Sequence, residues 1–133
     1  MSKTKLSYEE FDKQICEAFP NLYRMRNADP KTTCMYWGFE IDRGWYDLVW
    51  DLSEKLEALI LQQPEEVRES FYADQVKSKY AELRFYMSSG TDEMHKEISE
   101  AEDLSVVTCE RCGQPGRQYG VGWVTTLCEE CAK

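Results

Sequence analysis

The stretch Cys109-Glu-Arg-Cys112 is followed, after fifteen intervening residues, by Cys128-Glu-Glu-Cys131. Two cysteine pairs, each separated by two residues, have the spacing of a tetrahedral zinc site. A two-residue loop brings two thiolates about one tetrahedron edge apart, while its backbone N–H groups point at the sulfurs. Four thiolates leave no open position on the metal, so the pattern indicates one structural zinc ion and no catalytic metal. The alternative is two disulfides or a redox-active pair.

The residues around these cysteines predict a zinc ribbon. Two short strands, at 117–119 and 123–127, would form a hairpin between the two cysteine pairs. Val106-Val-Thr108 leads into the first pair with no linker, so we expect a ribbon of residues 106–133 that is docked on a domain of residues 1–105. The metal would replace a hydrophobic core that about 25 residues cannot supply.

The composition limits the class of protein. The chain has 133 residues, of which 42% are apolar and 13% aromatic, enough for one domain or one domain with a small module. The net charge of −9 makes free nucleic acid an unfavourable partner for the protein as a whole. The polar N-terminal segment resembles no signal peptide and no run reaches transmembrane length, so we expect a cytoplasmic protein with reduced thiols and no membrane partner.

Residues 1–105 predict an α+β domain with about three helices and a short antiparallel sheet. The first helix begins at Ser7, with Glu10 as the second member of a capping box. The second spans Trp45–Gln62 and carries an apolar stripe at helical spacing. The third is capped by Thr91 or Asp92.

The segments between these helices are predicted to be extended. Residues 71–80 and 81–87 would be two strands around a turn near 78–81, although the first of them could also be helical. Residues 65–70 predict a short acidic turn or helix. An aromatic strand is expected over 33–41, and it either lies in the core or forms an exposed aromatic patch.

Two further features lie outside the predicted zinc site. The helix after Thr91 has a strongly acidic face, which is either a solvated surface or a docking surface for a basic partner. Cys16 and Cys34 lie outside the zinc set and are expected to be small buried hydrophobic residues.

Seven short blocks with distinctive residue combinations are distributed along the chain. They are Phe19-Pro-Asn-Leu-Tyr23, Cys34-Met-Tyr-Trp-Gly-Phe-Glu40, Gly44-Trp-Tyr-Asp-Leu48, Gln75-Val-Lys-Ser-Lys-Tyr80, Leu83-Arg-Phe-Tyr86, Cys109-Glu-Arg-Cys-Gly-Gln-Pro-Gly116 and Gly122-Trp-Val-Thr-Thr-Leu-Cys128. Together they resemble a family of small hypothetical proteins encoded by bacteriophages and prophages. The resemblance runs from about Phe19 to Cys131, and where members often carry Gly-Gly or Gly-Thr this chain has Ala81-Glu82. It implies a phage setting, and therefore a host cytoplasm, but no activity.

The residues favour a binding protein over an enzyme. No Ser/His/Asp set, glycine-rich phosphate loop or open metal site is visible in the sequence. Negative charge, abundant aromatic residues and a structural zinc predict a protein-binding module. The phage setting that the resemblance implies narrows this to an accessory protein that binds a host protein, such as a defence or nucleic-acid-processing factor. The residues expected to form its binding surface are Trp37, Trp45, Arg84, Arg117, Tyr119 and Trp123.

The alternative is a zinc-ribbon protein that binds nucleic acid or a nucleotide. It requires the basic side chains to converge, together with aromatic rings, on one local groove. The basic residues concerned are Arg24, Arg26, Lys77, Lys79, Arg84, Arg111 and Arg117.

Overall fold

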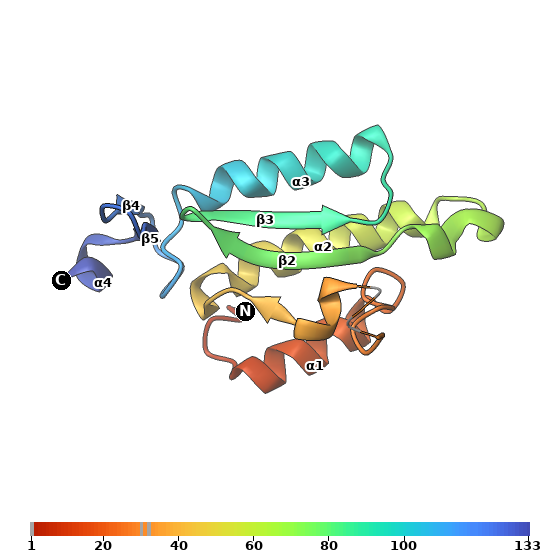
Figure 1. The fold of residues 1–133 in the computed structure, drawn as a ribbon, viewed down its shortest axis with the longest axis horizontal. Coiled ribbons are helices and arrows are strands. Elements are labelled where there is room, and N and C mark those ends of the chain that lie inside the picture. Colours follow the sequence, from red (N-terminus) through yellow and green to blue (C-terminus); the bar gives the residue numbers. More distant parts are fainter. Residues whose placement is uncertain (1, 30, 32) are drawn as a thin grey trace.

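A three-stranded sheet with helices packed around it forms the larger part of the molecule, and the C-terminal hairpin lies at one end of it (Figure 1). The computed structural model describes residues 2–29, 31 and 33–133. This mixed arrangement confirms the α+β class. The sheet strands are β1 (Phe39–Glu40), β2 (Ala73–Lys79) and β3 (Glu82–Met87). The α-helices are α1 (Tyr8–Ala18), α2 (Tyr46–Leu61), α3 (Asp92–Ser105) and the short α4 (Glu129–Ala132).

Helix α1 begins where the sequence predicts. The Ser7 hydroxyl accepts the Glu10 amide at 3.1 Å, and the Glu10 carboxylate accepts the Ser7 amide at 3.0 Å, so two of the free N–H groups at the helix start are satisfied. Phe11 lies on the buried face, where its ring stacks on Tyr46 with 3.9 Å between the centroids. This contact attaches α1 to the start of α2.

The central sheet is mixed, whereas the sequence predicted an antiparallel sheet. Strands β2 and β3 pair antiparallel, but β1 pairs parallel to β2. The chain leaves β1, runs through α2 and the 3₁₀ helix η3 (Glu65–Ser70), and only then returns as β2. A helical crossover of this kind delivers the next strand in the same direction, so the parallel pair follows from the connection.

The predicted strand over 33–41 is wrong for most of its length. Residues Cys34–Trp37 form the 3₁₀ helix η1, and only β1 is extended. The Thr33 hydroxyl caps η1 by accepting the Met35 amide at 3.1 Å, and Gly38 ends it at φ +77°. The local capping groups therefore override the strand propensity of the aromatic residues.

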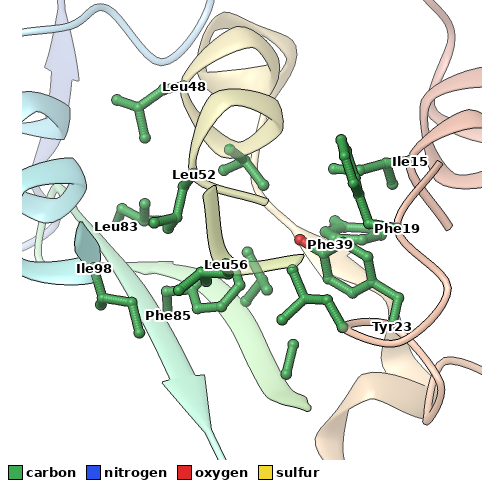
Figure 2. Close-up of a cluster of buried hydrophobic side chains, with 14 of the residues drawn as sticks. Ile15, Phe19, Tyr23, Phe39, Leu48, Leu52, Leu56, Leu83, Phe85 and Ile98 are labelled. Atoms are coloured by element: carbon green, nitrogen blue, oxygen red, sulfur yellow. The ribbon is translucent and has the colours of Figure 1, made fainter. Parts of the chain in front are cut away.

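Helix α2 is the centre of the core (Figure 2). On one side its leucines face strand β3 and α3, and on the other side lies a cluster carried by α1, the segment that follows it and strand β1. Figure 2 labels Leu48, Leu52 and Leu56 from α2, Leu83, Phe85 and Ile98 on the first side, and Ile15, Phe19, Tyr23 and Phe39 on the second.

In the part of the chain that the structure describes, no helix has the length and apolar character required to cross a bilayer.

The turn between β2 and β3 has an unusual backbone. Lys79 pairs with Glu82, so the turn contains only Tyr80 and Ala81, at φ +55° and +65°. The sequence placed a turn at this point. Two consecutive positive φ angles normally require Asn, Asp or Gly, because a Cβ is crowded in the left-handed region.

Candidate functional site

The four cysteines Cys109, Cys112, Cys128 and Cys131 come together in a single cluster at the end of the molecule. All four Sγ atoms lie within 4.8 Å of one another. The Sγ atoms of Cys112 and Cys128 are 3.5 Å apart. The cluster could therefore hold a metal ion.

The hairpin between the two cysteine pairs brings them together. Strands β4 (Arg117–Tyr119) and β5 (Thr125–Leu127) pair antiparallel, so the second pair returns to the first. Helix α4 starts at Cys128, whose sulfur accepts the Cys131 amide at 3.4 Å. Backbone N–H groups thus point at the sulfurs, as the two-residue loops require.

The donor set fits zinc. A Zn–S distance of about 2.3 Å in a tetrahedron places the sulfurs about 3.8 Å apart, which is close to the observed spacing. Burial alone would raise the pKa of Cys109, but hydrogen bonds from the backbone of Cys128, Cys112 and Arg111 lower it to about 7. In contrast, hydrogen bonding with the Cys128 sulfur raises the pKa of Cys131 to about 12. Cys109 thus releases its proton to a metal readily, whereas the proton of Cys131 would be displaced by the charge of the bound metal.

The cysteine cluster is attached to the main domain through backbone contacts at Gly44, in the short η2 helix (Arg43–Trp45). The Gly44 amide donates to the Glu110 carbonyl at 2.7 Å. A Cβ at position 44 would overlap the carbonyl of Cys109 and the backbone of Glu110. Only glycine permits this close approach of two backbones.

Side chains on both sides of the contact add to the attachment. The indole N–H of Trp45 donates to the Thr108 carbonyl at 2.9 Å, and the Thr126 hydroxyl donates to the Ala81 carbonyl at 2.6 Å. The Glu110 carboxylate accepts the Asp42 amide at 3.3 Å and the Ser78 hydroxyl at 3.2 Å. Burial of this carboxylate raises the pKa of Glu110.

A cavity of about 570 Å³ lies between the cysteine ribbon and the sheet. Four segments line it: the end of β1 with Asp42, the β2–β3 turn with Tyr80, the first cysteine pair with Glu110, and residues 122–125 before and within β5. The attachment of the ribbon to the domain therefore creates a concave site beside the candidate metal centre.

The four aromatic residues of the predicted binding surface lie in different environments. Trp37 and Trp123 are 64% and 89% exposed. Trp45 is fully buried, and its hydrogen bond to Thr108 connects the domain with the ribbon, so its ring is not available to a partner. Tyr119 is partly covered by Arg117, whose guanidinium lies 4.2 Å from the ring centroid.

The seven basic residues of the nucleic-acid alternative are divided among several places. Arg26 forms a two-pronged ion pair with Asp12, at 2.7 and 3.1 Å, and also donates to the Met35 and Tyr36 carbonyls. Arg24 bonds to Asn21. Only Lys79 and Arg111 of the seven line the 570 Å³ cavity.

A further basic pair lies on the sheet. Lys77 and Arg84 are opposite one another on β2 and β3, on the face that alternates with the buried Val76, Leu83 and Phe85. The Arg84 guanidinium lies 3.7 Å from the Glu82 carboxylate, so an acidic group lies beside this basic residue. The basic side chains thus do not form one continuous groove with the ribbon residue Arg117.

Sequence reasoning missed Tyr80 and Glu110 as members of a site. Tyr80 is 71% exposed, and both residues line the cavity. One signal was present: a turn with no Asn or Gly, flanked by two strands, forces a large aromatic residue into a positive φ. For Glu110, between two cysteines, the sequence carried no sign that its side chain would reach back to the domain.

Cys34 is exposed, so the expectation that it is buried is wrong, while Cys16 is partly buried against the core. No protein-family model, curated protein sequence or solved structure matches this chain.

Proposed function

We propose that this chain is a non-enzymatic accessory protein of the phage type, which holds one structural zinc ion and acts in the host cytoplasm by binding a host protein. The observation that carries the proposal is the exposure of two of its four tryptophans. Trp37 and Trp123 lie at the surface, although their rings are among the largest apolar groups in the chain. Tryptophan is strongly enriched at the energetic centres of protein interfaces.

The candidate metal centre supports a structural role for the ion. With zinc held by Cys109, Cys112, Cys128 and Cys131, all four tetrahedral positions would be filled by the protein. No position would remain for a water molecule or a substrate. The ion would instead hold the loop with Trp123 and the residues that contact Gly44 in place.

The charge distribution favours a protein over a nucleic acid as the partner. The net charge is −9, and the basic residues are distributed over separate surfaces. Phosphate binding requires a local cluster of basic side chains. An acidic protein with exposed aromatic rings is suited to a partner that presents a basic surface.

The experiment is an affinity purification of the tagged, zinc-loaded chain from a bacterial host, followed by quantitative mass spectrometry. Wild type is compared with Trp37→Ala, Trp123→Ala and the double variant. We expect at least one host protein to be recovered with wild type, and its yield to fall about tenfold or more in a variant that removes a tryptophan at the centre of the interface.

Leu61→Ala is the matched control. Leu61 is also a large exposed apolar residue, but it ends α2 and belongs to neither of the segments that carry Trp37 and Trp123. The yield of the host protein should be the same with Leu61→Ala as with wild type. Recovery of the same host proteins by wild type and by the double tryptophan variant would contradict the proposed binding surface. Recovery of nucleic acid in place of protein would favour the alternative function.

A further inference from the structure

The cavity beside the candidate metal centre has two aromatic walls. Tyr80 comes from the β2–β3 turn and Trp123 from the segment before β5, and both side chains line the cavity. They are 71% and 89% exposed, so their rings contribute little to the hydrophobic core. The Lys79 ammonium already lies 5.6 Å from the centre of the Tyr80 ring, so one face of this ring carries a cation of the chain itself. The other face of Tyr80 and the ring of Trp123 are left for a molecule that enters the cavity.

The turn itself does not explain the presence of Tyr80. A two-residue turn with positive φ at both positions is most favourable with Asn followed by Gly. Here Tyr80 and Ala81 occupy the two positions, and the hydrogen bond from Thr126 of the ribbon to the Ala81 carbonyl holds the turn in place. A strained backbone persists only where surrounding contacts determine it. The ribbon therefore holds the turn backbone from which the Tyr80 side chain projects.

The charged groups of the cavity favour a cation. Three carboxylates line it, from Glu40, Asp42 and Glu110, against the two basic groups of Lys79 and Arg111. Arg111 already donates to the Cys131 carbonyl at 3.1 Å. In the part of the chain that the structure describes, no ion pair involves Glu40 or Asp42. One oxygen of Asp42 accepts the Arg43 amide at 2.7 Å, which leaves its other oxygen and the Glu40 carboxylate for a new partner.

We propose that this cavity receives a lysine or arginine side chain of the partner protein. The cationic group lies against the faces of Trp123 and Tyr80 and is directed toward the carboxylates of Glu40 and Asp42. Aromatic faces attract cations through the ring quadrupole, and the acidic groups add a charge-assisted hydrogen bond. This inference rests on the proposed function and specifies the chemistry of its partner.

A nucleobase could also stack on the two rings, but the carboxylates disfavour it. A nucleotide would carry its phosphates into a cavity with three acidic and two basic groups. The net charge of the whole protein, −9, opposes the same ligand. The basic protein segment is therefore the occupant that fits the charges of the site.

The test uses the full zinc-loaded chain, labelled with ¹⁵N, and capped tripeptides of defined sequence. Gly-Arg-Gly and Gly-Lys-Gly are titrated against the chain, and Gly-citrulline-Gly is the neutral control of the same shape as the arginine probe. We expect saturable shifts of the Trp123 indole N–H and the Tyr80 amide with the two cationic peptides, and none with the citrulline peptide. The Trp37 indole should not shift.

Three variants identify the groups responsible. Trp123→Ala and Glu40→Gln should each weaken binding of the arginine peptide, the first by about tenfold, which is the range of a cation–π contact in a partly desolvated site. Tyr80→Asn removes the ring while it suits the positive φ, so the variant should fold at least as well as wild type and still lose affinity. Loss of binding in a fully folded Tyr80→Asn protein cannot be attributed to unfolding.

Three results would overturn the inference. The first is the absence of saturable shifts at Trp123 with either cationic peptide up to about 20 mM, which corresponds to negligible affinity. The second is saturable binding of a ten-nucleotide single strand at the same residues that is weakened by Lys79→Gln. The third is a host partner that is retained by a Tyr80→Asn, Trp123→Ala double variant, which would exclude this cavity while the proposed function would stand. The converse result, cation binding in the cavity but no host protein recovered, would contradict the proposed function alone.

Discussion

The Ser105 hydroxyl accepts the backbone amide of Leu83 at 2.9 Å and donates to the Glu102 carbonyl at 2.6 Å. Strand β3 is an edge strand of the sheet, and its outward N–H groups would otherwise be free to pair with another chain. Helix α3 satisfies two of them, because the Glu102 carboxylate accepts the Phe85 amide at 3.2 Å. The helix thus closes an edge that the sheet alone leaves open.

Ser105→Ala should reduce the free energy of unfolding by about 1–3 kcal/mol, because it leaves the buried Leu83 amide without its acceptor. Urea denaturation followed by circular dichroism measures the change. Ser99→Ala is the control, since Ser99 is an exposed residue of the same helix and its loss should change stability by less than about 0.5 kcal/mol. Equal effects of the two substitutions would show that the Leu83 amide does not depend on Ser105.

Gly44→Ala should detach the ribbon from the domain, at a cost of about 3 kcal/mol or more, because the new Cβ overlaps the Cys109 and Glu110 backbone. The readout is the Trp45 indole N–H resonance, which reports its hydrogen bond to Thr108. Gly122→Ala is the control. Position 122 has φ +82° and open space where a Cβ would lie, so this variant should lose only about 1 kcal/mol and leave the Trp45 signal unchanged.

Metal analysis should find one zinc ion per chain, and strong chelators should unfold the ribbon. Cys128→Ser should abolish stoichiometric zinc binding, since Cys128 also begins α4 and accepts the Cys131 amide. Cys34→Ser should bind zinc as wild type does, because Cys34 is exposed and outside the cluster. A metal-free protein with an intact ribbon in its NMR spectrum would contradict the assignment.

Stability should fall at alkaline pH, in part because of Cys16. Burial, together with the nearby Asp12 carboxylate, raises the pKa of Cys16 from 9.0 to about 12. Above pH 9 the unfolded chain loses this proton while the folded chain keeps it, so the stabilisation is complete below pH 9 and is lost as the pH rises toward 12. The slope for one such group approaches about 1.4 kcal/mol per pH unit.

The measurement is the free energy of unfolding of wild type and Cys16→Ser between pH 7 and about 10.5, with the difference between the two proteins as the result. The zinc site is common to both and cancels in this comparison. The free energy of unfolding of wild type minus that of Cys16→Ser should fall above pH 9 and stay constant below it. A difference that does not depend on pH would mean that the Cys16 thiol titrates equally in both states.

Local signals in the sequence predicted the local structure well. The capping box of Ser7 and Glu10, the apolar stripe of α2 and the spacing of the cysteines each act over a few residues, and each appears in the structure. These signals depend on helix periodicity, N-cap chemistry and ligand spacing, which are properties of a short segment.

Contacts between distant segments could not be predicted in the same way. The parallel pairing of β1 with β2 depends on where α2 packs, and the burial of Trp45 depends on a carbonyl 63 residues later in the chain. The cavity is formed by four segments that meet only after the ribbon attaches. The turn with Tyr80 and the segment with Trp123 line this cavity together, an arrangement that no short segment encodes.

The backbone contact at Gly44 bears on how such a ribbon can be inherited. A cysteine ribbon exchanged by recombination would fit this domain only if a glycine already stood opposite its first cysteine pair and an indole donor stood beside it, as Gly44 and Trp45 do. Conversely, residues 106–133 moved into another protein would lose the carbonyl and amide partners that they use here. Domain and ribbon therefore depend on one another, because a change on either side of the contact limits which residues the other side can carry.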